Sequence, residues 1–75
     1  MQNIQNFTAI IEKEDDMYVS LCAELDVASQ GDTVEEAKAN LKEAIELLFK
    51  HASKEEIANR LKSDVFITNL QIAVG

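Results

Sequence analysis

The sequence predicts an α+β domain, in which one long helix packs on one face of a twisted, antiparallel-rich sheet, in the order β-β-β-α-(α)-β. Two segments rich in β-branched and aromatic residues, "NFTAIIEK" and "MYVSLCA", flank a charged loop and are typical of a hairpin. A capped amphipathic helix follows a short third strand, and an alternating segment comes last. Strands in series followed by a helix favour a sheet covered on one face.

The first two predicted strands alternate in polarity, and residues 12–16, "EKEDD", form the loop between them. One face of these strands carries both apolar and polar residues. Its members are Thr8, Ile10 and Glu12 from the first strand and Tyr18, Ser20 and Cys22 from the second. The segment "DVASQGD" predicts a third strand that ends at Gly31, a residue type able to adopt backbone conformations that others resist.

The helix that follows has clear start signals. Thr33 and Glu36 form a capping box, and Asp32 suits the positive end of the helix dipole. One apolar stripe predicts a helix from about Thr33 to Lys50, and its members are Val34, Ala37, Leu41, Ala44, Ile45 and Leu48. Asparagine is a weak helix former, so we expect the amide of Asn40 to bond nearby loop backbone and orient the helix on the sheet.

Two further elements are predicted after this helix. Ser53 and Glu56 form a second capping box, which opens a short helix through Leu61. The segment "DVFITNLQIAVG" is predicted to be the last strand, with a more apolar face made of Phe66, Thr68, Leu70, Ile72 and Val74. An unpaired sheet edge can add a strand from a partner, so this strand is a candidate contact.

Length and composition narrow the class of protein. The 75 residues form one domain, 1–75, which is small enough that we expect a homodimer or larger homo-oligomer. Fourteen acidic and seven basic residues give a formal net charge of −7, which disfavours direct nucleic-acid binding and suits a basic partner. One cysteine excludes an internal disulfide, and no apolar run approaches the ~20 residues of a membrane span. We therefore expect a cytoplasmic protein without membrane contact.

The sequence offers no convincing catalytic, metal or cofactor residues. Metal-dependent nuclease chemistry needs several carboxylates converging from strands and a helix, whereas the acidic residues here fall in a hairpin loop and at a helix start. His51 is the single histidine and suits a helix C-terminus. Cys22 has no basic neighbour in sequence, so we expect a buried or half-buried thiol. The sequence predicts a protein that is not an enzyme.

Binding is the stronger functional interpretation. An uncovered face with Ile10, Tyr18 and Cys22 would form an apolar patch of the kind that marks an interface, either with a partner or with a second copy. Alternatively, the short second helix covers this face, or the apolar residues have no such role. The acidic hairpin residues are Glu12, Glu14, Asp15 and Asp16. They are either solvated surface or a group that steers a basic partner.

Two stretches carry a resemblance to a known family. "SQGDTVEEAKANLKEAIELLF", preceded by "FTAIIEKEDDMYVSLCAELDV", resembles the HicB family of type II toxin–antitoxin antitoxins in its short form. Gly31, the Asp-Thr and Glu-Glu-Ala that follow, Asn40 and the Glu-Ala at 43 and 44 stand where that family's pattern has them. The resemblance extends from about Phe7 to Phe49, and the closing "VFITNLQIAV" fits the family's last strand.

The resemblance implies a partial RNase H-like fold and an antitoxin that occludes HicA, a small basic ribonuclease toxin, without catalysis or a cofactor. Two features depart from the family. The sequence printed here stops at Gly75 without a basic recognition helix, so we expect no direct DNA binding. The loop 23–26 also lacks the family's usual proline. Two alternatives stay open: a stand-alone dimerising or adaptor module without a toxin partner, and a residual nuclease, which a divalent metal would stabilise in a thermal melt.

Overall fold

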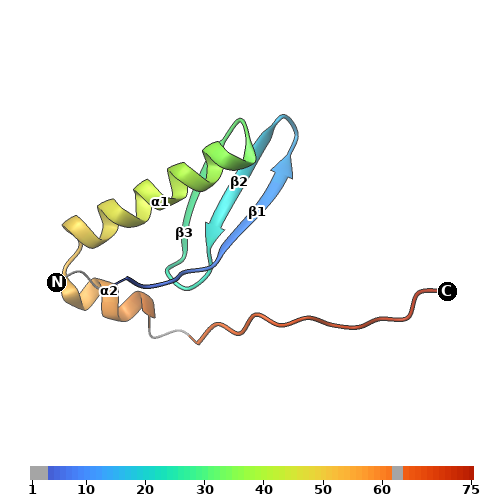
Figure 1. Cartoon of the computed structure of the whole chain (residues 1–75). Helices are drawn as coiled ribbons and strands as arrows, with labels where there is room; N and C mark the ends of the chain where they lie inside the picture. The colour runs from blue at the N-terminus through green and yellow to red at the C-terminus, as the bar shows by residue number, and fades with distance from the viewer. Residues whose placement is uncertain (1–3, 62–63) are drawn as a thin grey trace.

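Three strands and two helices are found in the part of the chain that the structure describes. A computed structural model describes residues 4–61 and 64–75 (Figure 1). The elements are β1 (Ala9–Glu14), β2 (Met17–Cys22), β3 (Val27–Gly31), α1 (Val34–His51) and α2 (Lys54–Leu61). The strands form one antiparallel sheet in the order β1-β2-β3. The predicted α+β class is confirmed, with the order β-β-β-α-α.

The β1–β2 hairpin is tighter than the sequence predicts. The two strands pair as far as Glu14 and Met17, so that only Asp15 and Asp16 remain in the turn. Asp15 has a φ of 54°, a left-handed conformation that short polar side chains tolerate better than most. Glu12, predicted to lie in the loop, is therefore part of β1.

The register of the hairpin decides which residues share a face. Residues directly opposite one another in an antiparallel pair point the same way. Tyr18 and Cys22 pair with Lys13 and Ala9, on the side of the sheet that α1 covers, whereas Ile10 pairs with Leu21 on the other side. The predicted common face of Ile10, Tyr18 and Cys22 is therefore wrong. The alternation within each strand is as predicted, but which faces combine depends on the register between strands.

The core lies between α1 and the sheet. Cys22, Leu25, Ala37 and Leu41 are buried, and four partly buried residues pack around the cluster, namely Phe7, Val27, Ile45 and Leu48. α1 packs mainly against β3, less against β2 and least against β1. The predicted apolar stripe thus faces the sheet, except that Val34 at its start is 42% exposed.

Side-chain hydrogen bonds fix α1 on the sheet. The buried hydroxyl of Ser20 donates to the carbonyl of Ala37 at 2.9 Å. The amide of Asn40 donates to the carbonyl of Gln30 at 2.7 Å, so its backbone partner lies in β3 and not in a loop. Because these two bonds reach two different strands, they fix both the position of the helix along the sheet and its rotation about its own axis.

Gly31 is required where β3 approaches α1. Its φ is not positive, so the reason is not the backbone conformation that the sequence suggests. A Cβ atom at this position would lie 2.6 Å from the backbone nitrogen of Ala37 and 2.9 Å from the Cβ of Glu36. Only glycine allows the strand and the first turn of the helix to come this close.

Both helices begin at the predicted caps. Thr33 is the N-cap of α1, and its hydroxyl oxygen accepts from the N–H of Glu36 at 3.0 Å. The Glu36 carboxylate accepts from the N–H of Asp32, one residue earlier than in a standard capping box. At α2, the hydroxyl oxygen of Ser53 accepts from the N–H of Glu56. The sequence signals therefore place both helix starts correctly.

Residues 64–75, which we call the tail, are extended but form no strand with the rest of the chain (Figure 1). The predicted last strand is therefore wrong for the single chain. A strand is stabilised by pairing with a neighbouring strand, and no strand of the described residues pairs with the tail. Among the described residues, no helix combines the length and apolarity that crossing a membrane would require.

Candidate protein-binding surface

The face of the sheet turned away from α1, which we call the open face, exposes apolar side chains. Its apolar residues are Ile10, Met17, Val19, Leu21 and Ala28. Ile10 is 39% exposed and Leu21 is 37% exposed, while Met17 and Val19 are half-buried by their neighbours. Neither α1 nor α2 packs on this face. Contiguous apolar surface of this kind is typical of a contact with another protein.

The open face changes from apolar to acidic along the strands. At one end, Ile10, Leu21 and Ala28 form a row across β1, β2 and β3. The next row has Glu12 beside Val19, and Glu14 lies beside Met17 at the turn. The apolar residues and the hairpin carboxylates thus form one continuous surface.

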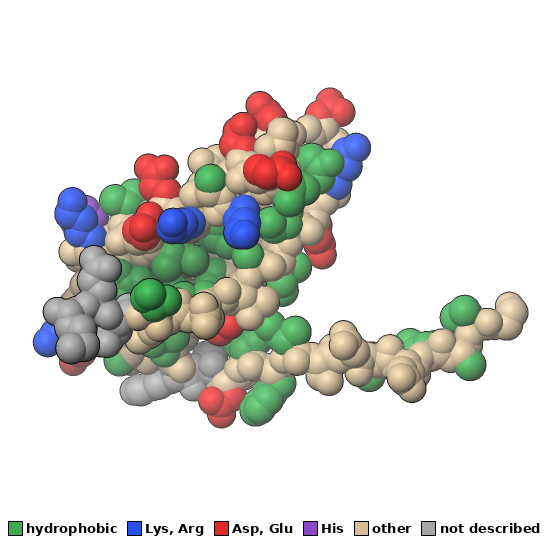
Figure 2. Space-filling view, in the orientation of Figure 1, with side chains coloured by type: hydrophobic (Ala, Val, Ile, Leu, Met, Phe, Trp, Pro, Cys, Tyr) green, Lys and Arg blue, Asp and Glu red, His purple; other side chains and the backbone are tan. Residues whose placement is uncertain are grey.

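Half of the 14 acidic residues lie at the end of the molecule where β1 meets β2 and where α1 begins. This acidic end consists of Glu12, Glu14, Asp15, Asp16, Asp32, Glu35 and Glu36. Figure 2 shows acidic side chains gathered over the hairpin turn and the start of α1. In the described residues an ion pair joins Arg60 to Glu56, on α2 and away from this end. The acidic end therefore presents a negative potential to an approaching partner.

The predicted interface residues separate into three environments. Ile10, Glu12 and Glu14 lie on the open face, and Asp15 and Asp16 form the exposed turn beside it. Tyr18 is half-buried on the side of the sheet that α1 covers. Cys22 is fully buried in the core. The structure therefore brings the five residues of β1 and its turn together, and separates Tyr18 and Cys22 from them.

Burial makes Cys22 a structural residue. Its thiol donates to the Glu24 carboxylate, with 3.6 Å between the sulfur and the oxygen. Burial is the main reason that the pKa of Cys22 is raised, and the nearby charge of Glu24 raises it further. A thiol that is buried and held protonated is a poor nucleophile.

Glu24 holds the β2–β3 turn against the segment that precedes β1. Its two carboxylate oxygens each accept from the N–H of Thr8 at 3.0 Å, and one also accepts from the Thr8 hydroxyl at 2.8 Å. Burial alone raises the pKa of Glu24, but these hydrogen bonds outweigh it, and the net pKa is lowered. No local pattern in the sequence indicates this role of Glu24, because its partner is 16 residues away.

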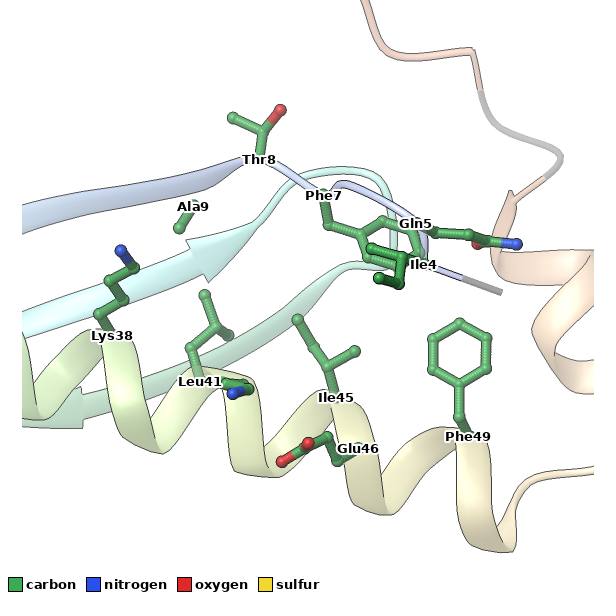
Figure 3. A pocket seen from close by; sticks show the side chains of 11 residues that line it. Ile4, Gln5, Phe7, Thr8, Ala9, Lys38, Leu41, Ile45, Glu46 and Phe49 are labelled. Atoms are coloured by element: carbon green, nitrogen blue, oxygen red, sulfur yellow. The ribbon is translucent and has the colours of Figure 1, made fainter. Parts of the chain in front are cut away.

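An apolar groove, also not predicted, lies between α1 and the start of β1 (Figure 3). Its volume is about 960 Å³. Phe7, Leu41, Ile45 and Phe49 form much of its lining, and the rings of Phe7 and Phe49 lie 5.9 Å apart. In Figure 2 the same region is a green floor beneath lysine and acidic side chains. The sequence signal that could have indicated this groove is the pair Phe7 and Phe49, because Phe49 lies outside the predicted apolar stripe of the helix.

The described residues show no group of three or more His, Cys, Asp or Glu side chains placed to hold a metal ion. His51 is the exposed last residue of α1.

Comparison with known proteins gives one informative relative. The chain is similar to the UPF0150 protein ssl0738 of Synechocystis sp., with 56% identity over 43 residues. The match covers 55% of this chain and 60% of that protein, so the chain spans less than two thirds of its relative's length. No protein-family model matches the chain, and no solved structure matches it. The similarity is compatible with the HicB-like interpretation and leaves its function as a proposal.

Proposed function

We propose that the protein is a non-catalytic antitoxin, which binds a small basic ribonuclease toxin of the HicA type and covers its active site. The observation that supports this most directly is the continuity of the open face with the hairpin carboxylates. A basic partner would meet the acidic end first and then pack apolar side chains on the strands. The resemblance to HicB antitoxins supplies the identity of the partner, and the cytoplasm is the compartment we expect for the pair.

The charge distribution favours a basic protein over a nucleic acid. Phosphate backbones are bound by clusters of Lys and Arg, whereas this chain carries a formal net charge of −7. The acidic end also combines two groups of carboxylates, one in the hairpin and one in the first turn of α1. A ribonuclease surface that binds RNA is itself positive, so the same surface would accept the acidic end and lose access to its substrate.

Occlusion requires no reactive group on the antitoxin. Cys22 is buried, and the exposed carboxylates of the hairpin lie on a turn and an adjacent strand face. What the mechanism requires is a rigid surface, because flexible side chains lose entropy when they are immobilised at an interface. Residues on paired β-strands fulfil this requirement better than residues on loops do.

The test begins with tagged protein used to capture partners from the native cell, with washes at moderate and then high salt. We expect one small basic protein that elutes as the salt concentration rises. Its ribonuclease activity is then titrated with the purified chain, and inhibition should be complete near one chain per partner. A captured basic protein whose ribonuclease activity is unchanged by excess chain would contradict the antitoxin proposal.

A second candidate, a self-associating module without a toxin partner, is favoured by one specific observation. The apolar groove beside α1 and the apolar tail are both free in the single chain. If the capture experiment recovers only the protein's own chain, this second function replaces the first.

A further inference from the structure

Apart from Asp64 at its start, the tail is apolar, uncharged and exposed. Residues 65–75 contain no Asp, Glu, Lys, Arg or His. Phe66 is 87% exposed, Leu70 is 83% exposed and Val74 is 89% exposed, and each of these lies on the face that alternation makes more apolar. Exposing a continuous apolar strand is unfavourable in water and is an aggregation hazard unless something covers it.

The tail also makes the single chain unusually extended. The radius of gyration is 14.7 Å, and the longest dimension is 50 Å against 29 and 22 Å for the other two. A compact chain of this length has a radius of gyration of about 11 Å. The core is small, with four buried apolar residues in the described part of the chain. Both facts point to a chain that completes its packing with another molecule.

The groove beside α1 has the chemistry to receive such a strand. Its floor is apolar, and Lys38, Lys42 and Glu46 lie along α1 at its border. An uncharged strand suits this arrangement, because the border charges keep their contact with water while the apolar side chains fill the floor. The groove adjoins Ala9 at the start of β1.

The edge of β1 beside the groove is also free. Within residues 4–61 and 64–75, β1 pairs with β2 alone, so its other edge has backbone N–H and C=O groups without a strand partner there. α1 packs least against β1. A strand added beside β1 would therefore extend the sheet on the side that the helix covers least. Ten extended residues span about 33 Å, enough to follow β1 and most of the segment Ile4–Thr8 that leads into it.

We propose that residues 65–74 of one copy fill the groove of a second copy and pair with the free edge of its β1, while the second copy returns the same contact. Two copies so joined have two identical interfaces related by a two-fold axis. Both free elements, the groove and the tail, are then covered by one arrangement.

The direction in which the tail runs indicates that the groove is filled by the tail of a second copy and not by the tail of its own chain. Arg60, near the end of α2, donates to the carbonyl of Leu25 at 2.9 Å and so anchors the helix end from which the tail departs. From there the tail runs away from the groove, as the trace at the upper right of Figure 3 shows, and its far end stands clear of the body in Figure 1. The proposal does not depend on the toxin partner, because it concerns a different surface from the open face.

The first test is the mass of the full chain in solution, measured by light scattering across a range of concentrations. We expect a dimer, with twice the 8.4 kDa mass of one chain. The double variant Leu70→Asp and Ile72→Asp should weaken the dimer at least tenfold, because it places carboxylates on the apolar floor. The control Asn69→Asp and Gln71→Asp adds the same charge to the other face of the tail and should leave the dimer intact. A wild-type monomer, or equal dimerisation of the two variants, would overturn the proposal.

The second test identifies the occupant. Phe66 is replaced by p-benzoylphenylalanine in ¹⁵N-labelled chain, which is mixed with an equal amount of unlabelled wild-type chain and irradiated. We expect the tail peptide to cross-link to residues 43–50, a tryptic peptide that carries Ile45 and Phe49, with labelled and unlabelled forms of that peptide in about equal amounts. Cross-links only to the labelled peptide would show a tail that folds onto its own chain. Cross-links elsewhere would show a different surface, and either result rejects the exchange.

Discussion

At the scale of single residues, Glu24 makes the stability of the fold depend on pH. The Thr8 hydrogen bonds lower the pKa of Glu24 in the folded chain below its ordinary value of 4.5. A lowered folded-state pKa means that Glu24 contributes stability at pH values above about 4.5, and that this contribution is lost as the pH falls through the folded-state pKa.

We therefore predict that Glu24→Gln is less stable than the wild type at pH 7, by about 1 to 2 kcal/mol, because a charged acceptor of three donors is lost. The difference between the two proteins should shrink as the pH is lowered below 4.5. Urea unfolding at a series of pH values measures it. Glu43→Gln, which changes an exposed carboxylate on α1, is the control, and its curve should run parallel to the wild type. A Glu24→Gln difference that is constant from pH 7 to pH 3 would contradict the assigned role.

Gly31 provides a second prediction at this scale. Gly31→Ala places a Cβ atom 2.6 Å from the backbone nitrogen of Ala37, so β3 and α1 must move apart. We expect a loss of about 2 kcal/mol in the free energy of unfolding, as for other overpacked sites. Urea unfolding measures it, with Gln30→Ala as the control, since that exposed side chain precedes Gly31 on the same strand. A loss below about 0.5 kcal/mol would mean that the close approach relaxes easily.

At the scale of elements, the hairpin carboxylates should control the rate of partner association. We predict that Glu12→Gln, Glu14→Gln, Asp15→Asn and Asp16→Asn together slow association about tenfold at low salt and flatten its salt dependence. Dissociation should barely change, because these groups lie at the border of the apolar surface. Stopped-flow mixing with the captured partner measures both rates.

The matched control removes the same number of charges elsewhere. Glu43→Gln, Glu46→Gln, Glu55→Gln and Asp64→Asn also change the formal net charge from −7 to −3. If net charge alone drives the encounter, the two quadruple variants will have equal association rates and salt slopes, and the hairpin has no special role.

The elements themselves were predictable because their signals are local. The capping signals at Thr33 and Ser53 place the starts of α1 and α2, since each hydroxyl accepts from a backbone N–H only three residues further along the chain. Alternation identifies β1 and β2 for the same reason. The register between the strands is not local, and it moved Tyr18 and Cys22 to the face opposite Ile10. The candidate surface was therefore predicted in part, with the right hairpin and a wrong combination of faces.

At the scale of the whole molecule, the contacts that sequence reasoning missed are those between distant segments. Glu24 meets Thr8, and the groove forms where the start of β1 passes α1. The tail has the alternation of a strand, yet its apolar face finds no partner within the described chain. A sequence pattern shows that a segment is suited to a sheet, but not which sheet. The exchange that we propose would give the tail a sheet in a second copy.

The two proposals assign two different surfaces of the molecule to two different contacts. In the dimer we propose, the groove and the tail join two copies of the chain, whereas the open face and the acidic end stay available for another protein. Because the groove lies on the side of the sheet that α1 covers and the open face lies on the other side, a variant of the tail should leave partner binding per chain unchanged, and a variant of the open face should leave the dimer unchanged. The two proposals can therefore fail independently.

The measurement that tests partner binding most directly is titration calorimetry of the captured partner with Ile10→Asp and with Ala39→Asp. Both variants add one acidic charge, the first on the open face and the second on an exposed position of α1. We predict that Ile10→Asp weakens binding at least tenfold, although it makes the protein more acidic, and that Ala39→Asp binds as the wild type does. Equal affinities for the two variants would show that the partner does not pack on the open face.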